Sequence, residues 1–480
     1  MQQQKDILFG TDGWRGVLDA ELNVQNVERV AQAFSDYITE GVTHTPQIAV
    51  GYDGRYRSKD FAVAFSGVLA GNGIRVLLAS TIVPTPVVAY HTVYQRCDAG
   101  VMVTASHNPP QYNGIKFKSP AGAPLITSET KRIEAFLDEH QPRRLPGEVD
   151  EVDFLTDYKT RLGQLIDFSA IYRSGMKMAI DSMAGAGGHL LSELCSAHHI
   201  PASGIYQQPA PDFAGRQAEP IEKNLQPLAR FLKNGDFTLG VATDGDADRL
   251  GVMTEQGQWM NVQETILYLA QYVKTQRRLP GGLVKTLSVT DKMIALAKQQ
   301  QVAFRDVQVG FKYVAESMMD IQAAFGAEES GGFGFGDHLP ERDGIFSALL
   351  FAEMLANSGH SSLSDFIEAK RKEWGPVYYD RVDMQYTGQD RFQLLQNLYH
   401  VPPVQIGDFP VKELLHHCTS RGVINSLKFY LEGEPRWLLI RISETEPVVR
   451  IYAEGRSFAE VKQLLDEGRQ LIQMPGKGDG

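Results

Sequence analysis

The stretch that decides the fold class of this chain is QIAVGYDGRYRSKDFAVAFSGVLAGNGIRVLLAS, residues 47–80. Its apolar residues predict a strand at Gln47–Asp53, a helix that begins near Ser58 with Ser58 as the N-cap, and a second strand at Ile74–Ser80. Because strand and helix periods alternate over so short a distance, the stretch is typical of an α/β unit.

The same alternation recurs further along the chain. Strand-like segments stand at Ala99–Ser106, Met176–Asp181 and Gly282–Thr290, each near a helical segment. The last hundred residues differ, because three strand-like segments precede one amphipathic helix that begins near Ser457, with Phe458 on its apolar side. We therefore expect three related α/β modules and a C-terminal α+β module. The expected domains are residues 1–148, 149–255, 256–372 and 373–480.

Composition narrows the classes of protein. The 480 residues are 43% hydrophobic and 22% charged, which is ordinary for globular proteins. With a net charge of −11 and no Lys/Arg-rich block, the chain is not expected to bind nucleic acid or an anionic membrane. No apolar stretch is long enough to span a bilayer, and the N-terminus lacks the apolar core of a signal peptide. Three widely spaced cysteines supply neither a disulfide framework nor a zinc motif, so we expect a cytoplasmic protein.

The segment TASHNPPQYNGIKFK, residues 104–118, follows an apolar strand and presents Ser106 at its carboxyl end. Ligands of open α/β sheets bind at that end. A serine becomes a nucleophile only with a base, a positive environment or a phosphoryl group already in place, and Lys116 is the nearest titratable candidate. The alternative is a turn in which Ser106 bonds to its own backbone.

The segment ATDGDADRLGVM carries Asp244, Asp246 and Asp248 at two-residue spacing after another apolar strand. Three carboxylates at this spacing suit a divalent cation such as Mg²⁺. A calcium-binding EF-hand is excluded, because Arg249 stands at the sixth position, where glycine is required. The alternative is an acidic, solvated turn.

Two further segments have the composition of ligand-binding loops. In GAEESGGFGFGDHLPERDG, Glu328, Glu329 and Ser330 can accept hydrogen bonds from sugar hydroxyls, although a surface turn would look similar. RISETEP, residues 441–447, lies between two strands. Its donors to a phosphate are Arg441, Ser443 and Thr445, unless the segment is only an exposed hairpin.

Together the four segments supply what is needed to move a phosphoryl group on a phosphosugar. No GxxxxGK[ST], GxSxG or HExxH motif is present, and no GxGxxG is completed, so nucleotide-driven kinases, α/β-hydrolases, zincins and dinucleotide enzymes are not expected.

With TASHNP, DGDADR and the opening FGTDGWRG, residues 9–16, the chain resembles the α-D-phosphohexomutase superfamily over its whole length. The resemblance implies an α/β fold of four domains around a central cleft, three of them related mixed-sheet modules and the fourth an α+β module with an antiparallel sheet. The resemblance implies that Ser106 is the phosphorylated nucleophile, that Lys116 is the acid/base, and that Arg15 and Arg249 are active-site arginines. The implied ligands of Mg²⁺ are Ser106, Asp244, Asp246 and Asp248. The implied substrate-binding residues are His107, Lys312, Glu328 and Ser330, and those that bind the second phosphate are Arg441, Ser443 and Thr445.

The implied reaction is the interconversion of glucose 1-phosphate and glucose 6-phosphate through glucose 1,6-bisphosphate, with hexose phosphates as partners of a monomer or homodimer. Two departures bear on this expectation. Glu444 puts an anion beside the phosphate loop, where we expect it to point away or to pair with Arg450. Gly332 stands where the phosphomannomutase-like subgroup tends to show histidine, and with Glu329 it favours a glucose phosphate. The alternatives are a phosphomannomutase, a glucosamine phosphate mutase, a glucose 1,6-bisphosphate synthase and a non-catalytic phosphosugar-binding regulator.

Overall fold

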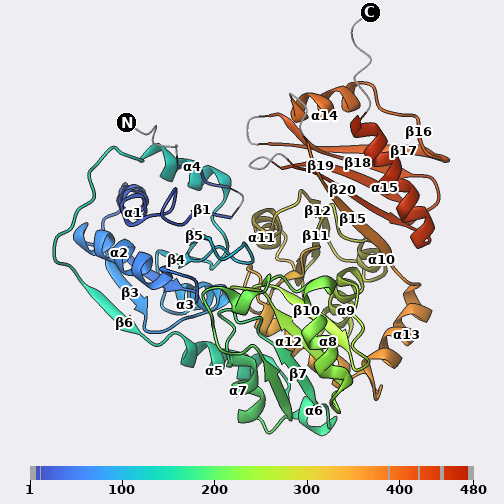
Figure 1. Cartoon of the computed structure of the whole chain (residues 1–480), viewed down its shortest axis with the longest axis horizontal. Helices are drawn as coiled ribbons and strands as arrows, with labels where there is room; N and C mark the ends of the chain where they lie inside the picture. The colour runs from blue at the N-terminus through green and yellow to red at the C-terminus, as the bar shows by residue number, and fades with distance from the viewer. Residues whose placement is uncertain (1–6, 11, 387–389, 420–421, 444–447, 474–480) are drawn as a thin grey trace, which may run out of the picture.

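The computed structural model describes residues 7–10, 12–386, 390–419, 422–443 and 448–473, which form four sheets in chain order (Figure 1). Three sheets are mixed and covered by helices, and the fourth is antiparallel, so the predicted α/β architecture of four domains is confirmed. No helix in this part of the chain combines the length and apolarity needed to cross a bilayer.

Domain I contains a six-stranded sheet in the order β1-β5-β4-β2-β3-β6. Strands β2, β3, β4 and β6 run parallel, whereas β5 is antiparallel to β4 and to β1. The elements are β1 (Trp14–Val17), α1 (Val24–Thr39), β2 (Gln47–Tyr52), α2 (Ser58–Gly71), β3 (Arg75–Ala79), α3 (Thr85–Tyr94), β4 (Ala99–Val103), β5 (Tyr112–Lys118), α4 (Thr127–Ala135) and β6 (Val149–Val152).

The start of α2 corrects one expectation. The N-cap residue is Arg57, at a φ of 63°, and Ser58 is the first helical residue. The Ser58 hydroxyl donates to Asp53 Oδ1 at 2.6 Å and accepts from Asn113 Nδ2 at 2.8 Å, so its hydrogen bonds lead away from the helix.

Domain II contains a four-stranded sheet in the order β10-β9-β7-β8, with β10 antiparallel to β9. Its elements are α5 (Leu155–Leu165), α6 (Phe168–Arg173), β7 (Met178–Asp181), α7 (Leu190–Ala197), β8 (Ala202–Ile205), the 3₁₀ turns η1 (Phe213–Gly215) and η2 (Glu222–Asn224), α8 (Gln226–Lys233), β9 (Leu239–Thr243) and β10 (Leu250–Thr254).

Domain III repeats this plan in the order β12-β11-β13-β14, with β14 antiparallel to β13. Its elements are α9 (Val262–Thr275), β11 (Leu283–Thr286), α10 (Lys292–Gln299), β12 (Phe304–Val307), α11 (Phe311–Asp320), β13 (Phe325–Glu328), β14 (Gly332–Phe335), α12 (Gly344–Ala356) and α13 (Leu363–Trp374). In all three domains, therefore, a strand with a parallel neighbour turns back into an antiparallel strand, at β4–β5, β9–β10 and β13–β14.

Domain IV is the separate orange-red lobe of Figure 1, with strands in the order β15-β20-β19-β18-β17-β16. Its elements are β15 (Tyr378–Gln385), α14 (Arg391–His400), β16 (Gln405–Ile406), β17 (Phe409–Cys418), β18 (Ile424–Leu431), β19 (Trp437–Ile442), β20 (Val448–Gly455) and α15 (Phe458–Gln473). The Ser457 hydroxyl accepts from the Glu460 N–H, as the sequence predicts. Phe458, predicted to be apolar-facing, is 66% exposed, because its ring meets the edge of Tyr378 instead of the core.

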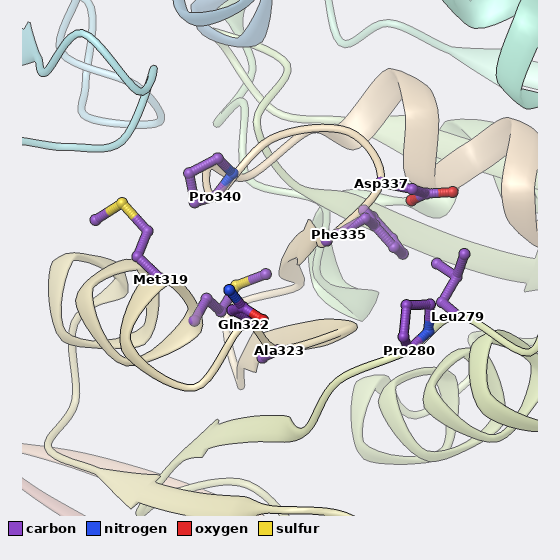
Figure 2. A pocket seen from close by; sticks show the side chains of 10 residues that line it. Leu279, Pro280, Met319, Gln322, Ala323, Phe335, Asp337 and Pro340 are labelled. Atoms are coloured by element: carbon purple, nitrogen blue, oxygen red, sulfur yellow. The ribbon is translucent and has the colours of Figure 1, made fainter.

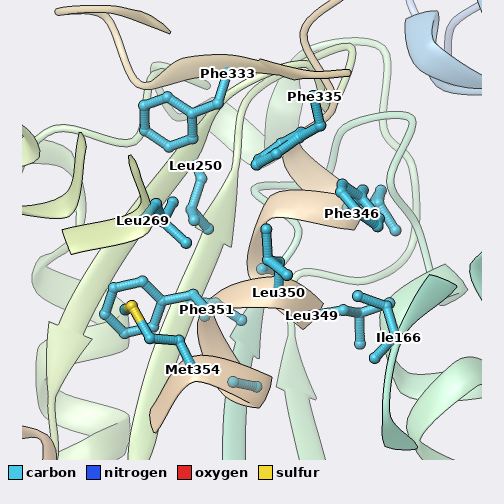
Figure 3. Close-up of a cluster of buried hydrophobic side chains, with 14 of the residues drawn as sticks. Ile166, Leu250, Leu269, Phe333, Phe335, Phe346, Leu349, Leu350, Phe351 and Met354 are labelled. Atoms are coloured by element: carbon cyan, nitrogen blue, oxygen red, sulfur yellow. The ribbon is translucent and has the colours of Figure 1, made fainter. Parts of the chain in front are cut away.

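The largest apolar core joins domains II and III through α12 (Figure 3). Phe346, Leu350 and Phe351 of this helix lie among Leu250 of β10 and Phe333 of β14. Burying these side chains on both sheets fixes the β9–β10 and β13–β14 hairpins relative to each other. The loops at the tips of those hairpins carry two of the motifs found in the sequence.

Candidate active site

The tips of three equivalent hairpins meet at one place. The β4–β5 loop carries Ser106, the β9–β10 loop carries the three aspartates and the β13–β14 loop carries Ser330. The Ser106 hydroxyl donates to Asp244 Oδ2 at 3.0 Å, and the Leu250 N–H donates to the Gly331 carbonyl at 2.9 Å. A similar fold in each domain thus brings together segments that are more than 200 residues apart.

Ser106 is held in an uncommon conformation. Its φ is 54°, in the left-handed region, and only 1% of the residue is exposed. His107 Nδ1 lies 3.3 Å from Ser106 Oγ, and Arg15 on β1 donates to Asn108 Oδ1 at 2.8 Å. Burial, and then the charges of Arg249 and Arg15, hold the pKa of His107 well below its usual value, so the ring is neutral. The predicted His107 therefore lies on the serine loop, and the predicted Arg15 contacts this loop from β1.

The three predicted metal ligands form a buried cluster. One oxygen of each of Asp244, Asp246 and Asp248 lies within 4.8 Å of the others. Asp244 Oδ1 accepts from the N–H groups of Asp248 and Arg249, at 2.9 and 3.1 Å. Burial and the carboxylates of Asp248 and Asp246 raise the pKa of Asp244 well above its usual value. Within the cluster, Asp244 is therefore the carboxylate whose charge burial and its neighbours disfavour, whereas, despite burial, Lys116 lowers the pKa of Asp246.

The fit of a divalent cation can be tested on the oxygen atoms. Within the described chain, Asp246 Oδ1 and Asp248 Oδ1 are buried and have no hydrogen-bond partner. Buried carboxylate oxygens without partners are costly, and hard oxygen donors are what Mg²⁺ takes. The Oδ2 atoms of the same residues are already engaged by cationic or hydroxyl groups. The residues present therefore fit a magnesium ion, for which Asp246 and Asp248 would supply their unpartnered Oδ1 atoms.

Lys116 on β5 lies against this cluster. Its Nζ is 2.8 Å from Asp246 Oδ2, 3.2 Å from Asp248 Oδ2 and 3.1 Å from Asp12 Oδ2. Burial alone would lower the pKa of Lys116, but the three carboxylates outweigh it and raise the pKa above its usual value. In this state Lys116 is an ammonium group able to donate a proton.

Arg249 connects the metal loop to the third hairpin. Its Nε lies 3.9 Å from Asp244 Oδ2 and 3.8 Å from Asp248 Oδ1, and its backbone pairs with Gly332. A Cβ atom at Gly332 would lie 2.4 Å from Arg342 Cδ, so a larger residue would displace the Arg342 side chain. The glycine that departs from the mannose-type pattern therefore leaves room for Arg342 beside Asp248.

The predicted sugar-binding residues lie together at the end of β13. The Ser330 hydroxyl donates to Glu328 Oε1 at 2.6 Å, and Arg342 Nη1 lies 3.3 Å from the same oxygen. Burial, with a smaller effect of Glu329, raises the pKa of Glu328. Lys312, in the first turn of α11, is 7% exposed, with its Nζ 5.0 Å from the centre of the Tyr313 ring. Glu328 and Ser330 are thus paired, whereas Lys312 comes from the neighbouring helix.

The predicted phosphate loop is described only in part. Arg441 lies on β19 opposite Arg450 of β20, and the Ser443 carbonyl accepts from Arg391 Nε at 3.1 Å. Thr445 and Glu444 lie outside the described residues. Arg450 Nε lies 3.5 Å from Asp383 Oδ2. The expected pairing of Arg450 with Glu444 is therefore neither confirmed nor contradicted.

Arg441 faces the rest of the site through Tyr452. Burial raises the pKa of Tyr452, Glu329 of the sugar loop raises it further, and Arg441 lowers it. Leu439 and Tyr452 pack with Leu287 and Val309 of domain III, and Arg441 follows Leu439 on the same face of the sheet. The face of the domain IV sheet that carries Arg441 therefore packs against domain III.

Sequence reasoning missed three residues of this site. Asp12 accepts from Arg342 Nη2 at 2.7 Å and pairs with Lys116, and Thr85 donates to Asp246 Oδ2 at 2.5 Å. Arg342 also lies 3.0 Å from Asp248 Oδ2. Asp12 and Arg342 stand inside the segments FGTDGWRG and GAEESGGFGFGDHLPERDG, so a charged residue within a recognised motif could have indicated that they belong to the site. Thr85 stands in no such motif.

A second concavity is not part of this site. A pocket of about 490 Å³ lies between α11 and the segment that follows β14, with Met319, Gln322, Phe335, Asp337 and Pro340 among its walls (Figure 2). Its lining is mostly apolar and includes no lysine or arginine. Because a phosphosugar needs cationic partners, this pocket does not suit one.

This arrangement defines the class of the α-D-phosphohexomutases. Three repeated α/β domains carry the loop of Ser106, the acidic triad and the β13–β14 loop, and a fourth domain follows them in the chain. Models of the phosphoglucomutase/phosphomannomutase family match this chain in order: α/β/α domain I at residues 6–144, domain II at 156–257, domain III at 261–373 and the C-terminal domain at 408–471. The chain belongs to this family, and it is an enzyme of the isomerase class, a phosphohexomutase.

Known relatives match nearly the full length. A phosphoglucomutase/phosphomannomutase of Thermococcus kodakarensis is 28% identical, with 98% of this chain and 99% of the relative covered. A phosphoglucosamine mutase of Caldicellulosiruptor bescii is 29% identical, with 97% and 98% covered. The crystal structure of a Thermus thermophilus protein assigned as a phosphomannomutase is 34% identical, with a TM-score of 0.82 and 98% and 99% covered. These names span glucose, mannose and glucosamine phosphates, so the relatives fix the class of reaction and not the sugar.

Proposed function

We propose that this enzyme interconverts glucose 1-phosphate and glucose 6-phosphate through a phosphoserine at Ser106 and a glucose 1,6-bisphosphate intermediate. The observation that carries the proposal is the buried contact of 3.0 Å between Ser106 Oγ and Asp244 Oδ2. A serine hydroxyl so close to three carboxylates has little use in packing, but it is well placed for a phosphoryl group held beside a cation.

The proposed reaction consists of two phosphoryl transfers in opposite directions. In the first, a free sugar hydroxyl oxygen bonds to phosphorus, the bond from phosphorus to Ser106 Oγ breaks, the hydroxyl loses its proton and Ser106 Oγ gains one. The bisphosphate then turns over, and the second transfer returns the other phosphoryl group to Ser106. Lys116 is the proposed acid/base: its ammonium group, which lies among the carboxylates of the site, would donate a proton to the departing Ser106 Oγ, and the amine so formed would accept the proton that the sugar hydroxyl loses.

Charge and orientation come from the surrounding residues. Asp244, Asp246, Asp248 and the phosphoserine would hold Mg²⁺, which when bound neutralises charge on the transferring group. Arg15 and Arg249 add positive charge beside the serine and metal loops. Neutral His107 can hydrogen-bond to substrate without adding charge.

The sugar and its second phosphate need their own contacts. Glu328, Ser330 and Lys312 are the proposed partners of the sugar hydroxyls, because Glu328 and Ser330 form a hydrogen-bonded acceptor and hydroxyl pair and Lys312 is a buried cation at the start of α11. The proposed grip on the second phosphate is Arg441, with Ser443 and Thr445.

We infer a preference for glucose over mannose phosphates of about tenfold or more, since a site that hydrogen-bonds one hydroxyl discriminates against its epimer. The preference rests on the polar residues Glu328, Glu329 and Ser330 of the β13–β14 loop, in which Glu329 accepts from Ser288 at 2.6 Å. A coupled assay of kcat/KM for glucose 1-phosphate, mannose 1-phosphate and glucosamine 1-phosphate, with and without added glucose 1,6-bisphosphate, tests it. Equal values would contradict the preference, net release of bisphosphate would indicate a synthase, and no turnover would indicate a binding regulator.

The covalent step has its own test. Ser106→Ala should abolish turnover and remove the phosphoryl group that intact mass detects on the wild type, with the thermal midpoint unchanged. Ser66→Ala is the matched control, because Ser66 is also a buried serine of domain I but lies in α2. Substantial activity in Ser106→Ala would rule out the phosphoserine mechanism.

A further inference from the structure

Arg55, a buried arginine of domain I, binds the backbone of the serine loop, by which we mean the β4–β5 loop that carries Ser106. It lies just after β2, a strand that carries none of the residues of the candidate active site. Arg55 follows β2, is 3% exposed, and donates through Nη2 to the carbonyl oxygens of Ser106 and Asn108, each at 2.6 Å. Its Nη1 donates to the carbonyl oxygens of Pro109 and Tyr112, each at 3.0 Å. Each of the two terminal nitrogens thus binds two carbonyl oxygens of one loop.

Two further side chains hold Arg55 in place, and the first of them is Asp53. Asp53 Oδ2 lies 3.3 Å from Arg55 Nε, and both side chains are fully buried. The same Asp53 oxygen accepts from Thr104 Oγ1 at 2.6 Å, and Thr104 Oγ1 accepts from the Ser106 N–H at 2.9 Å. The chain of contacts therefore leads from Arg55 to both the N–H and the carbonyl of Ser106.

The second side chain is Phe213, which connects Arg55 and the serine loop to domain II. The Arg55 guanidinium carbon lies 4.6 Å from the centre of the Phe213 ring. Phe213 is 2% exposed and packs beside Gly245 of the metal loop, where a Cβ atom would lie 3.0 Å from the ring and 2.3 Å from the Ser106 carbonyl oxygen. Arg55 thus lies under the point at which the serine and metal loops touch.

The loop needs such support because its conformation is unfavourable. A serine at a φ of 54° is strained, and two prolines in the loop supply no N–H groups for internal hydrogen bonds. Because a trans peptide directs its C=O and N–H oppositely, binding the Ser106 carbonyl also fixes the direction of the His107 N–H. We propose that Arg55 is a positioning residue that holds the Ser106 loop in the geometry required for phosphoryl transfer. This inference rests on the proposed phosphoserine function.

A lysine at position 55 cannot make the hydrogen bonds that Arg55 makes to four carbonyl oxygens. A guanidinium presents five N–H donors in a fixed planar fork, whereas an ammonium group presents three from a single atom. Arg55→Lys keeps the charge opposite Asp53 but cannot serve two pairs of carbonyl oxygens. We expect kcat to fall about 100-fold, as a small misplacement of reacting groups commonly does, with KM for glucose 1-phosphate within about threefold of the wild type.

The experiment compares Arg55→Lys and Phe213→Leu with a surface control, Arg57→Gln, in the full-length enzyme with Mg²⁺. Arg57 is two residues away and 36% exposed in its side chain, and it pairs with Asp19 on the surface. The measurements are kcat, KM, the rate at which glucose 1,6-bisphosphate phosphorylates Ser106, followed by intact mass, and the thermal midpoint.

The proposal predicts that kcat and the phosphorylation rate fall together in Arg55→Lys, fall less in Phe213→Leu and stay unchanged in Arg57→Gln, with KM preserved. A folded Arg55→Lys enzyme whose kcat is within about threefold of the wild type would overturn the proposal. A loss of folding in both Arg55→Lys and Phe213→Leu would also overturn it, because the contacts would then be purely structural. A wild-type enzyme without mutase activity or phosphoserine would instead overturn the proposed function itself.

Discussion

Thr85 donates a hydrogen bond of 2.5 Å from Oγ1 to Asp246 Oδ2, and its N–H bonds to the Asp246 carbonyl oxygen at 3.0 Å. Thr85 is the first residue of α3 in domain I and is fully buried, whereas Asp246 belongs to domain II. A hydroxyl of one domain therefore fixes a carboxylate of another. The contact occupies Oδ2 and leaves Oδ1, which has no partner in the described chain, for a cation.

The first prediction follows from this contact. Thr85→Val keeps the side-chain shape and removes the hydroxyl, so the Mg²⁺ concentration for half-maximal activity should rise about 10- to 100-fold, as for other residues that orient metal ligands. Activity at saturating Mg²⁺ should change much less. A titration of free Mg²⁺ in the activity assay measures both quantities.

Thr92→Val is the matched control. Thr92 is also buried in α3, but its hydroxyl donates to the Val88 carbonyl oxygen within the helix, at 2.8 Å. Its removal should leave the magnesium dependence unchanged. An equal shift in both variants would mean that Thr85 acts only through the stability of the helix.

The second prediction concerns Lys116. Lys116→Gln removes the ammonium group from between Asp12, Asp246 and Asp248, so kcat should fall by about 10²- to 10⁴-fold, the usual range for a lost acid/base. Steady-state kinetics at saturating Mg²⁺ measures the loss.

Lys118→Gln is the control for burial of a lysine on the same strand. Lys118 is also fully buried but pairs with Glu341, so its loss should lower the thermal midpoint while reducing kcat much less. If both variants lost activity in proportion to stability, Lys116 would have no special role in proton transfer.

The third prediction is a pH dependence of stability at His91. Burial lowers the pKa of His91 to about 4, and the ring stacks on Phe154 with centroids 3.6 Å apart. The unfolded chain, with a histidine pKa near 6.5, then binds a proton that the folded chain excludes. The contribution of His91 is therefore complete above about pH 6.5 and declines as the pH falls from about 6.5 toward 4, by at most roughly 1.4 kcal/mol per pH unit.

Thermal unfolding between pH 7 and pH 4.5 tests this prediction. His91→Gln should lose less stability on acidification than the wild type, whatever its midpoint at pH 7. His44→Gln, in which a histidine with a 62% exposed side chain is replaced, should follow the wild-type curve. Parallel curves for the wild type and His91→Gln would show that other groups control the acid response.

Much of this molecule could be predicted because the signals are local. The strand at Gln47–Tyr52, the acidic triad and Ser106 each depend on neighbouring residues, and they were found from spacing and from the resemblance to the family. Periodicity also separated the antiparallel C-terminal sheet from the three α/β modules, since its strands follow one another without intervening helices.

The remainder depends on contacts between distant segments. Thr85 and Arg342 contact Asp246 and Asp248 from positions that lie 161 and 94 residues away in the sequence. Nothing in the residues around Thr85 indicates this contact, and the motif that contains Arg342 does not name its partner. The expected N-cap at Ser58 was wrong by one residue, because the helix begins at Ser58 and Arg57 is the capping residue. Phe458 fits a helix periodicity, but its ring packs edge-on against Tyr378 of β15 and stays 66% exposed.

The last prediction tests whether domain IV supplies the second phosphate site. A phosphohexose held with one phosphoryl group at Ser106 must place its other phosphate at a distance, so a separate cationic group is required. Arg441 on β19 lies on the sheet face that packs against domain III, and it is the candidate. One charge-assisted contact is worth roughly 1.5 to 3 kcal/mol, so Arg441→Ala should lower kcat/KM by about 10- to 100-fold. Because the phosphate is gripped in the ground state and the transition state alike, most of this loss should be a rise in KM. Phosphorylation of Ser106 on the purified enzyme should persist, since the serine belongs to domain I. Arg456→Ala is the control, because Arg456 follows the same sheet but bonds to the Glu434 carbonyl oxygen on the surface. An Arg441→Ala enzyme with the KM and kcat of the wild type would place the second phosphate elsewhere.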